Sequence, residues 1–132
     1  MKGLMKIKLI SVIVRDQEHA LGFYTEVLGF IKKTEFPVGD HKWLTVVSPE
    51  EPDGTQLVLE PAAHPAAATY QQALFETGTP LTSFLVDYVR GEAEKLKAPG
   101  VIFTMEPTDV GLGIIAVFDD TCGNFIEIYQ ET

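Results

Sequence analysis

The chain has 132 residues, which is the length of one compact domain with a substantial buried core. A hydrophobic fraction of 45% and a charged fraction of 22% are those of a folded globular protein, and no apolar run approaches the roughly 18 residues that a membrane span requires. The net charge of −9 disfavours nucleic acids and anionic membranes as partners, because both require a basic protein face.

The first predicted elements are a β-strand and a helix. Residues 6–14 alternate and are rich in β-branched side chains, which indicates a strand. The basic and then apolar N-terminus resembles a signal peptide but lacks a small-residue cleavage site, so we expect a cytoplasmic protein. Asp16 stands at the N-cap of a helix that Gly29 ends. One buried stripe is predicted on this helix, formed by Ala20, Phe23, Tyr24, Val27 and Leu28.

Three strand-like segments follow, and the same order of elements then returns. The three segments are residues 30–36, 42–48 and 55–60, with turn-forming Pro, Gly and Asp between them. An Ala-rich stretch at about 62–78 indicates a connecting helix. A strand, a weaker helix and three more strands are then predicted at residues 81–87, 88–100, 101–106, 112–118 and 124–130.

The two halves are copies of one βαβββ unit. Matched residues are separated by 72, 71, 70 and 69 positions, a drift that single-residue changes in loops produce. The sequence therefore predicts one α+β domain over residues 1–132, with tandem units at about 5–60 and 79–130. The matched pairs are Val14 with Val86, Gly29 with Gly100, Pro37 with Pro107, and Gly54 with Gly123.

Two motifs accompany this repeat: VxD…FYxxxLGF in the first unit and DxxGNxIEIY at the end of the second. Together with the two βαβββ units, they resemble the vicinal oxygen chelate superfamily of glyoxalase I, bleomycin resistance proteins and extradiol dioxygenases. The resemblance spans nearly the whole chain. It implies that the units form a curled mixed sheet with a cleft, and that the protein is a homodimer. The motifs are typical of the superfamily and do not identify one activity.

Enzymes of this superfamily hold a divalent metal on four side chains, one from the first and one from the last strand of each unit. The resemblance places these positions at Leu9, Val58, Leu81 and Glu127. Aliphatic side chains have no lone pair, and one carboxylate does not hold a divalent ion against water. We therefore expect neither a protein-held metal nor another cofactor, and metal-dependent glyoxalase or dioxygenase activity is disfavoured.

Strand alternation predicts which other side chains share the cleft face. The predicted face is mostly apolar, with a few polar groups, as in pockets where such groups orient an apolar ligand. The predicted ligand-binding residues, with no metal site among them, are Leu9, Ser11, Trp43, Gln56, Val58, Glu60, Leu81, Ser83, Phe125, Glu127 and Tyr129.

Several of these residues have a second interpretation. A desolvated carboxylate suits a general acid or base, or the partner of a ligand cation, so Glu127 is a candidate catalytic residue. Alternatively, its carboxylate is simply satisfied by neighbours such as Tyr129 or Gln56. For Glu60, near a strand end before Pro61, a solvated rim position is favoured over a role in binding. Trp43 is either a core residue or an aromatic wall for a flat or cationic ligand.

The histidines and the single cysteine give little functional signal. No two of the three histidines have the spacing of metal ligands. His41, in a turn beside Trp43, is either part of a lid over the cleft or a solvated turn residue. Cys122 is the only cysteine, which excludes an internal disulfide and a cysteine-based zinc site.

Three functions remain open. In the first, which we favour, the protein binds a cationic or aromatic small molecule, as drug-sequestering resistance proteins of this superfamily do. In the second, it is a metal-free lyase or isomerase that acts on a small carbonyl or thiol-adduct substrate, with Glu127 as acid or base. In the third, it is a metal enzyme whose ligands differ from the superfamily pattern, such as Glu127, Glu60 and His41. The acidic composition supports the first function, because it attracts cations.

Overall fold

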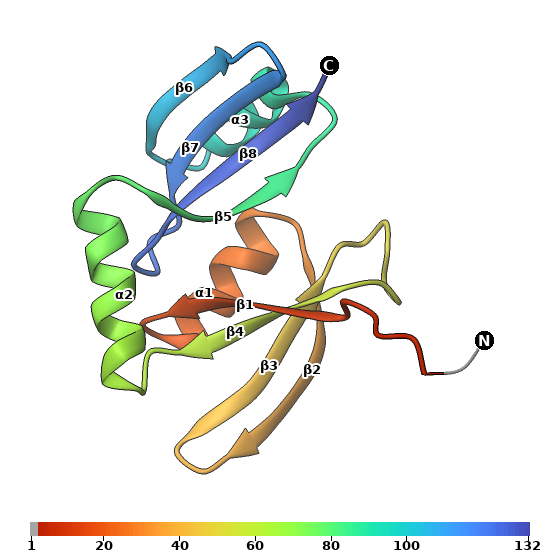
Figure 1. Ribbon diagram of the computed structural model, residues 1–132, viewed down its shortest axis with the longest axis vertical. Helices are drawn as coiled ribbons and strands as arrows, with labels where there is room; N and C mark the ends of the chain where they lie inside the picture. Colours follow the sequence, from red (N-terminus) through yellow and green to blue (C-terminus); the bar gives the residue numbers. More distant parts are fainter. Residues whose placement is uncertain (1–2) are drawn as a thin grey trace.

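The computed structural model describes residues 3–132 and confirms the predicted α+β fold of two tandem βαβββ units. The first unit consists of β1 (Leu9–Val14), α1 (Gln17–Gly22), the helical turn η1 (Phe23–Val27), β2 (Ile31–Val38), β3 (His41–Val47) and β4 (Gln56–Pro61). The second consists of β5 (Pro80–Leu85), α3 (Val89–Lys97), β6 (Phe103–Asp109), β7 (Gly113–Asp119) and β8 (Phe125–Glu131), and α2 (Pro65–Glu76) connects the two (Figure 1). Within the described residues, no helix is long and apolar enough to span a membrane.

Each unit forms its own four-stranded mixed sheet, so the strands make two sheets and not one. Sheet A has the order β1-β4-β3-β2, and sheet B has the order β5-β8-β7-β6. In both sheets the first strand of the unit pairs in parallel with the last, and the other pairs are antiparallel. The repeat detected in the sequence is thus a repeat of topology.

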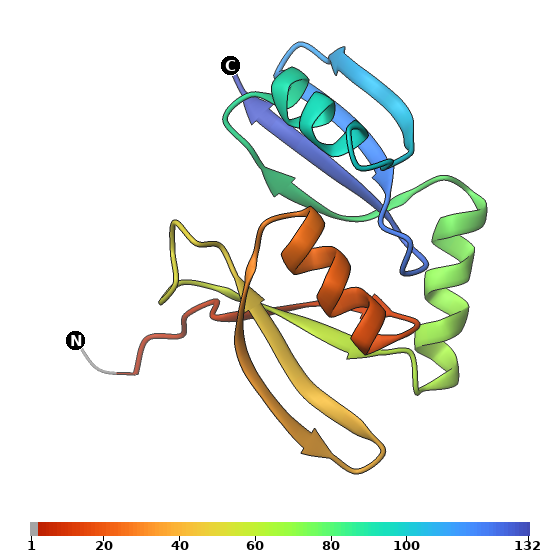
Figure 2. The same cartoon turned by 180° about the vertical axis from the view of Figure 1, so that it is seen from behind.

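One helix covers one face of each sheet, and both helix-covered faces contribute to a single core. The ring centroids of Phe23 and Phe118 lie 6.4 Å apart, so the helix of the first unit also contacts β7 of the second. Both α1 and α3 lie behind their sheets in Figure 1 and in front of them in Figure 2, with α2 beside the two sheets. The helix-free faces of sheets A and B are therefore on the same side of the molecule.

The helix of the first unit changes its hydrogen-bonding pattern halfway along. It begins after Asp16, whose carboxylate accepts the capping hydrogen bond that the sequence predicted. From Phe23 onward the turn is π-helical. The Thr25 hydroxyl donates a 2.6 Å hydrogen bond to the carbonyl of Leu21, and such back-bonding bends helices. Gly29 then ends the segment at a φ of 89°, where glycine is favoured.

The first strand is shorter than predicted. Residues 3–8 are exposed and have no regular secondary structure, although residues 6–8 continue the alternation of β1. β1 begins at Leu9, which pairs with Gln56, the first residue of β4. The N–H of Gln56 donates to the carbonyl of Lys8 (2.8 Å), but β4 begins at Gln56, so no residue of β4 lies opposite residues 6–8 to extend the ladder.

A buried polar network fixes the two units to each other. The Asp120 carboxylate accepts hydrogen bonds from the Tyr24 hydroxyl (2.6 Å) and from the Asn124 amide (2.8 Å). The Asn124 amide also donates to the carbonyl of Ile13 in β1 (2.7 Å), and the Gln71 amide of α2 donates to the same carbonyl (2.9 Å). Burial raises the pKa of Asp120, and burial together with the Asp120 charge raises the pKa of Tyr24 well above its ordinary value. The DxxGN motif therefore joins the units and does not face a ligand site.

Candidate functional site

The helix-free face of sheet B carries the most developed candidate site. Strand register places Ser83, Glu127, Val117 and Met105 side by side across all four strands. A hollow of about 350 Å³ lies on this face. Its lining consists of Gly78, Pro80, Thr104, Met105, Ile115, Val117, Phe125 and Glu127.

Glu127 is the only ionisable residue in this lining. Its Oε2 atom accepts a 2.6 Å hydrogen bond from the hydroxyl of Ser83, which stands directly opposite on β5. None of the salt bridges formed within residues 3–132 involves Glu127. The partner of this carboxylate is therefore neither Tyr129 nor Gln56, and its charge is not neutralised by the lining.

Phe125 forms the aromatic end of the hollow. Its ring is stacked on that of Phe75 from α2, with centroids 4.4 Å apart and planes 5° apart. The guanidinium of Arg15, just after β1, lies 5.8 Å from the centroid of the Phe75 ring. The stack thus connects the hollow to α2 and to the first unit.

Two predicted residues of the second unit lie outside this group. The register of β5 shifts between Pro80 and Thr82, and Leu81 packs against the hydrophobic core. Such an irregularity reverses the alternation of side chains, which explains why Pro80 lines the hollow and Leu81 does not. Tyr129 is partly buried and pairs with Leu85 farther along β8, beyond the lining.

The predicted residues of the first unit lie on the helix-free face of sheet A. Leu9 pairs with Gln56 and Ser11 pairs with Val58, which pairs in turn with Thr45. The Thr45 hydroxyl donates a 2.8 Å hydrogen bond to Gln56. Val58 and Thr45 are buried, whereas Leu9 is 49% exposed. The buried side chains of Val58 and Thr45 therefore fill the centre of this face.

Glu60 and Trp43 lie at one end of the same face. The Ser11 hydroxyl donates a long hydrogen bond of 3.4 Å to Glu60. Trp43 is half-buried, and its ring is stacked on that of Phe36 with centroids 6.4 Å apart. The amide of Gln17 donates to backbone carbonyls of both β3 and β4, each at 2.8 Å. Because Trp43 is half-buried and is absent from the lining of the hollow on sheet B, it is neither a core residue nor part of that hollow.

Of the eight residues that line the hollow, sequence reasoning named only Phe125 and Glu127 and missed six. Four of the missed residues, Thr104, Met105, Ile115 and Val117, come from β6 and β7, whereas the predicted residues came from the first and last strands of each unit, with Trp43 of β3 as the one addition. Pairing the predicted β7 with β8 as a hairpin would have placed Val117 opposite Glu127. The contribution of Gly78 and Pro80 depends on the path of the chain after α2, for which the sequence contains no pattern.

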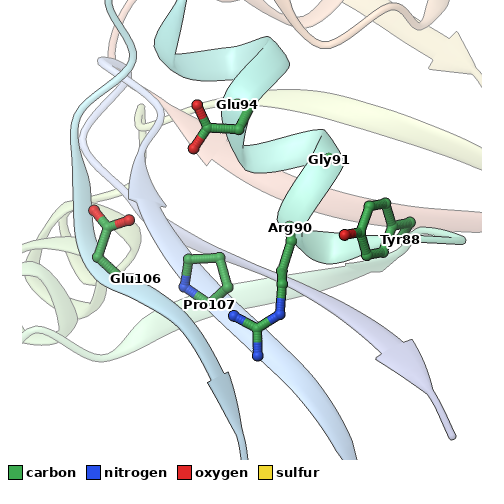
Figure 3. Close-up of a pocket in the computed structure, with 6 residues that line it drawn as sticks. All are labelled: Tyr88, Arg90, Gly91, Glu94, Glu106 and Pro107. Carbon is green, nitrogen blue, oxygen red and sulfur yellow. The ribbon is translucent and has the colours of Figure 1, made fainter.

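A second hollow, of about 510 Å³, lies between α3 and β6. Figure 3 shows Arg90 of α3 extending toward Pro107 of β6, with the carboxylates of Glu94 and Glu106 nearby. Glu106 is paired with Lys97. Exposed charged residues of both signs form half of its lining, and Tyr88, Gly91 and Pro107 form the rest. None of the predicted site residues is among them.

Comparison with known proteins identifies the family. The profile of the Glyoxalase/Bleomycin resistance protein/Dioxygenase superfamily matches residues 6–128. The chain belongs to this superfamily. The resemblance inferred from the motifs is therefore confirmed. The Bacillus subtilis (strain 168) protein YurT is 54% identical over 127 residues, which cover 96% of this chain and all of YurT. YetH of the same organism is 32% identical over 124 residues, which cover 92% of this chain and 94% of YetH.

Two crystal structures share the fold over its whole length. UcmS2 has a TM-score of 0.82 and 29% sequence identity, with coverage of 96% of this chain and 98% of UcmS2. TnmS3, described as an antibiotic binding protein from Streptomyces sp. CB03234, has a TM-score of 0.79 and 28% identity, with complete coverage of both chains. Antibiotic binding is thus a property of one structural neighbour.

The residues present do not fit the divalent metal that the superfamily implies. Of the four matched positions, Leu9, Val58 and Leu81 have no side-chain atom that can bind a metal ion. At the fourth position, one carboxylate oxygen of Glu127 accepts a hydrogen bond from Ser83. In the described part of the chain, no group of three or more His, Cys, Asp or Glu residues is arranged to hold a metal. The alternative ligand set of Glu127, Glu60 and His41 is therefore not brought together.

Proposed function

We propose that the protein binds a small organic molecule on its helix-free side, and that it sequesters this molecule without a protein-held metal. The hollow over sheet B carries the proposal. Its volume of about 350 Å³ is within the usual range of ligand pockets, and its apolar lining with one fixed carboxylate is the composition that such pockets have. The likeness to TnmS3, an antibiotic binding protein, supports a drug-like ligand.

The ligand that we propose is cationic or aromatic. Two stacked ring pairs, Phe75 with Phe125 and Trp43 with Phe36, supply flat apolar surfaces. Flat rings bind aromatic ligands through offset stacking, and they bind cations through their electron-rich faces. The net charge of −9 increases the local concentration of cations around the protein.

We further propose that a second copy of the chain covers the ligand. Both helix-free faces are on one side of the molecule, so a ligand on sheet B of one chain has its other side open. Leu9 and Leu85 are exposed on these faces at the edge strands β1 and β5. A homodimer formed through this side removes both side chains from water and completes the binding site.

A second candidate function is metal-free catalysis. Glu127 lines the hollow, so its carboxylate is within reach of a carbonyl or thiol-adduct substrate bound there and could move a proton on it. This function differs from sequestration in one respect: the ligand is converted. A Glu127→Gln variant abolishes turnover if the carboxylate is the acid or base.

Calorimetry of the unliganded protein with a panel of cationic glycopeptides and flat aromatic amines tests the proposal. We expect saturable binding by at least one compound, a raised Tm, and recovery of the compound unchanged after incubation. A Met105→Trp variant fills the hollow from the edge strand β6 and is expected to weaken binding about tenfold or more. A compound recovered as product supports catalysis instead, and binding that Met105→Trp leaves unchanged contradicts the location.

A further inference from the structure

We infer that the hollow over sheet B selects ligands in which a protonated amine is joined by a short linker to an aromatic ring. This inference rests on the proposed function and specifies its ligand class. The ligand class is specified by three features: a positive charge, the carboxylate of Glu127 that binds it, and the distance between the charged and the aromatic parts of the ligand.

The carboxylate of Glu127 has one oxygen free for a ligand. Ser83 donates to Oε2, and within residues 3–132 no hydrogen bond to Oε1 is formed. The hydroxyl therefore restrains the rotation of the carboxylate, and the second oxygen of this lining residue has no hydrogen-bond donor among the described residues. Ser83 is in this sense a positioning residue, because it acts through Glu127 and not on the ligand.

The rest of the lining favours a positive ligand group. Its other members are apolar side chains, one glycine, one proline and one threonine. An anionic ligand would place a second negative charge beside Glu127 in a partly desolvated space, whereas an ammonium group forms a charge-assisted hydrogen bond there. A neutral alcohol forms only the weaker, uncharged hydrogen bond.

The spacing between charge and ring follows from the strand. Phe125 and Glu127 are two residues apart on β8 and both line the hollow. Side chains two residues apart on a strand are separated by about 6.5 Å. A linker of two or three atoms between an aromatic ring and an amine spans this distance. The ring of Phe125 is held in place by its stack on Phe75, so it offers a preformed contact surface.

The test is a titration of ¹⁵N-labelled protein, followed by NMR, with three probes of similar size: phenethylammonium, 2-phenylethanol and 3-phenylpropionate. At neutral pH we expect phenethylammonium to shift the amides of Val117, Phe125 and Glu127 and to bind about fivefold or more tightly than 2-phenylethanol. We expect 3-phenylpropionate to bind most weakly. High salt reduces the preference for the amine, because it screens the ion pair.

Variants assign the preference to one carboxylate. Glu127→Gln is expected to abolish the preference, and Ser83→Ala to reduce it while phenethylammonium still contacts the hollow. Glu60→Gln is the matched control, because Glu60 also accepts a hydrogen bond from a serine but lies outside the hollow, and it is expected to retain the preference. The amide spectrum of each variant without probe reports whether it is folded.

The outcomes separate this inference from the proposed function. Equal binding of phenethylammonium and 2-phenylethanol at the hollow, unaffected by Glu127→Gln, overturns the cation selectivity and leaves small-molecule binding intact. Failure of all three probes to shift the hollow, while a compound of the antibiotic panel does, also overturns the inference alone. If neither the probes nor the panel shift these amides, the inference and the proposed function both fail.

Discussion

Burial decides what several single side chains do. Cys122 is 1% exposed, and burial together with the charge of Asp120 raises the pKa of its thiol far above the ordinary value. A thiol in this state is not a nucleophile, because the thiolate is the reactive form. Sequence alone could not give this result, since nothing next to Cys122 in the chain marks it as buried.

We expect the native protein to resist thiol modification. At pH 8, an aromatic disulfide reagent should label the unfolded protein with one equivalent and the native protein hardly at all over the same period. The release of the chromophore measures both. Rapid stoichiometric labelling of the native protein would contradict the burial of Cys122.

The Tyr24–Asp120 hydrogen bond makes a second residue-scale prediction. Tyr24→Phe removes a buried donor from Asp120, and we expect a loss of about 1–3 kcal/mol in the free energy of unfolding. Tyr70→Phe is the control, because Tyr70 is exposed on α2, and its effect is expected to stay within about 0.5 kcal/mol. Urea denaturation measures the free energy of unfolding of both variants. Equal losses would contradict a stabilising contribution from the buried Tyr24–Asp120 hydrogen bond.

At the scale of elements, order and type followed from the sequence, whereas local geometry did not. The repeat and the alternation of apolar residues predicted two βαβββ units. The first strand was nevertheless predicted to start too early, because alternation does not show where the partner strand begins. Leu81 was assigned to the wrong face for a related reason: the irregularity at Pro80–Thr82 depends on strand pairing.

The predicted site shows the same contrast between what alternation predicts and what local geometry decides. Ser83, Phe125 and Glu127 lie together on the predicted face because regular alternation holds from Ser83 onward and along β8. Gln56 and Val58 were placed on the correct face of sheet A, but a hydrogen bond to Thr45 and close packing occupy them. Alternation gives the face of a side chain. It does not give the neighbours that fill the space above it.

Two glycines in different elements make opposite predictions. A Cβ atom at Gly113 would lie 2.2 Å from the Gln130 carbonyl oxygen, so Gly113→Ala forces β7 and β8 apart. A Cβ atom at Gly22, in α1, meets nothing within 4 Å, so Gly22→Ala favours the helix. We expect destabilisation of about 1–3 kcal/mol for the first and stabilisation of about 0.5–1 kcal/mol for the second. Thermal unfolding distinguishes the signs, and stabilisation by Gly113→Ala would contradict the close approach.

At the scale of the whole molecule, the arrangement of the two sheets determines how a ligand is enclosed. Each sheet presents one face without a helix, and the two faces are on the same side of the chain. The sequence could not predict this arrangement, because it depends on hydrogen bonds between residues far apart in the chain: Tyr24 was predicted only as part of a buried helix stripe and a motif, and Asp120 and Asn124 only as motif residues.

The proposed homodimer leads to a prediction about the assembly of the protein in solution. Leu85→Glu places a charge on the exposed helix-free face of sheet B and is expected to weaken dimerisation about tenfold or more. Leu112→Glu is the control, because Leu112 is 91% exposed in the turn between β6 and β7. Sedimentation equilibrium measures both. A monomeric native protein, or equal effects of the two substitutions, would contradict the proposed interface.

The network around the Ile13 carbonyl has a further consequence. The side chains that clamp the two units together, from Tyr24, Gln71, Asp120 and Asn124, are buried away from the hollow over sheet B. Substitutions of lining residues on the edge strand β6, such as Thr104 and Met105, therefore leave these hydrogen bonds in place. A scaffold of this kind can change its selectivity by mutation while the orientation of its sheets is inherited unchanged, so new specificities are open to it without a loss of folding.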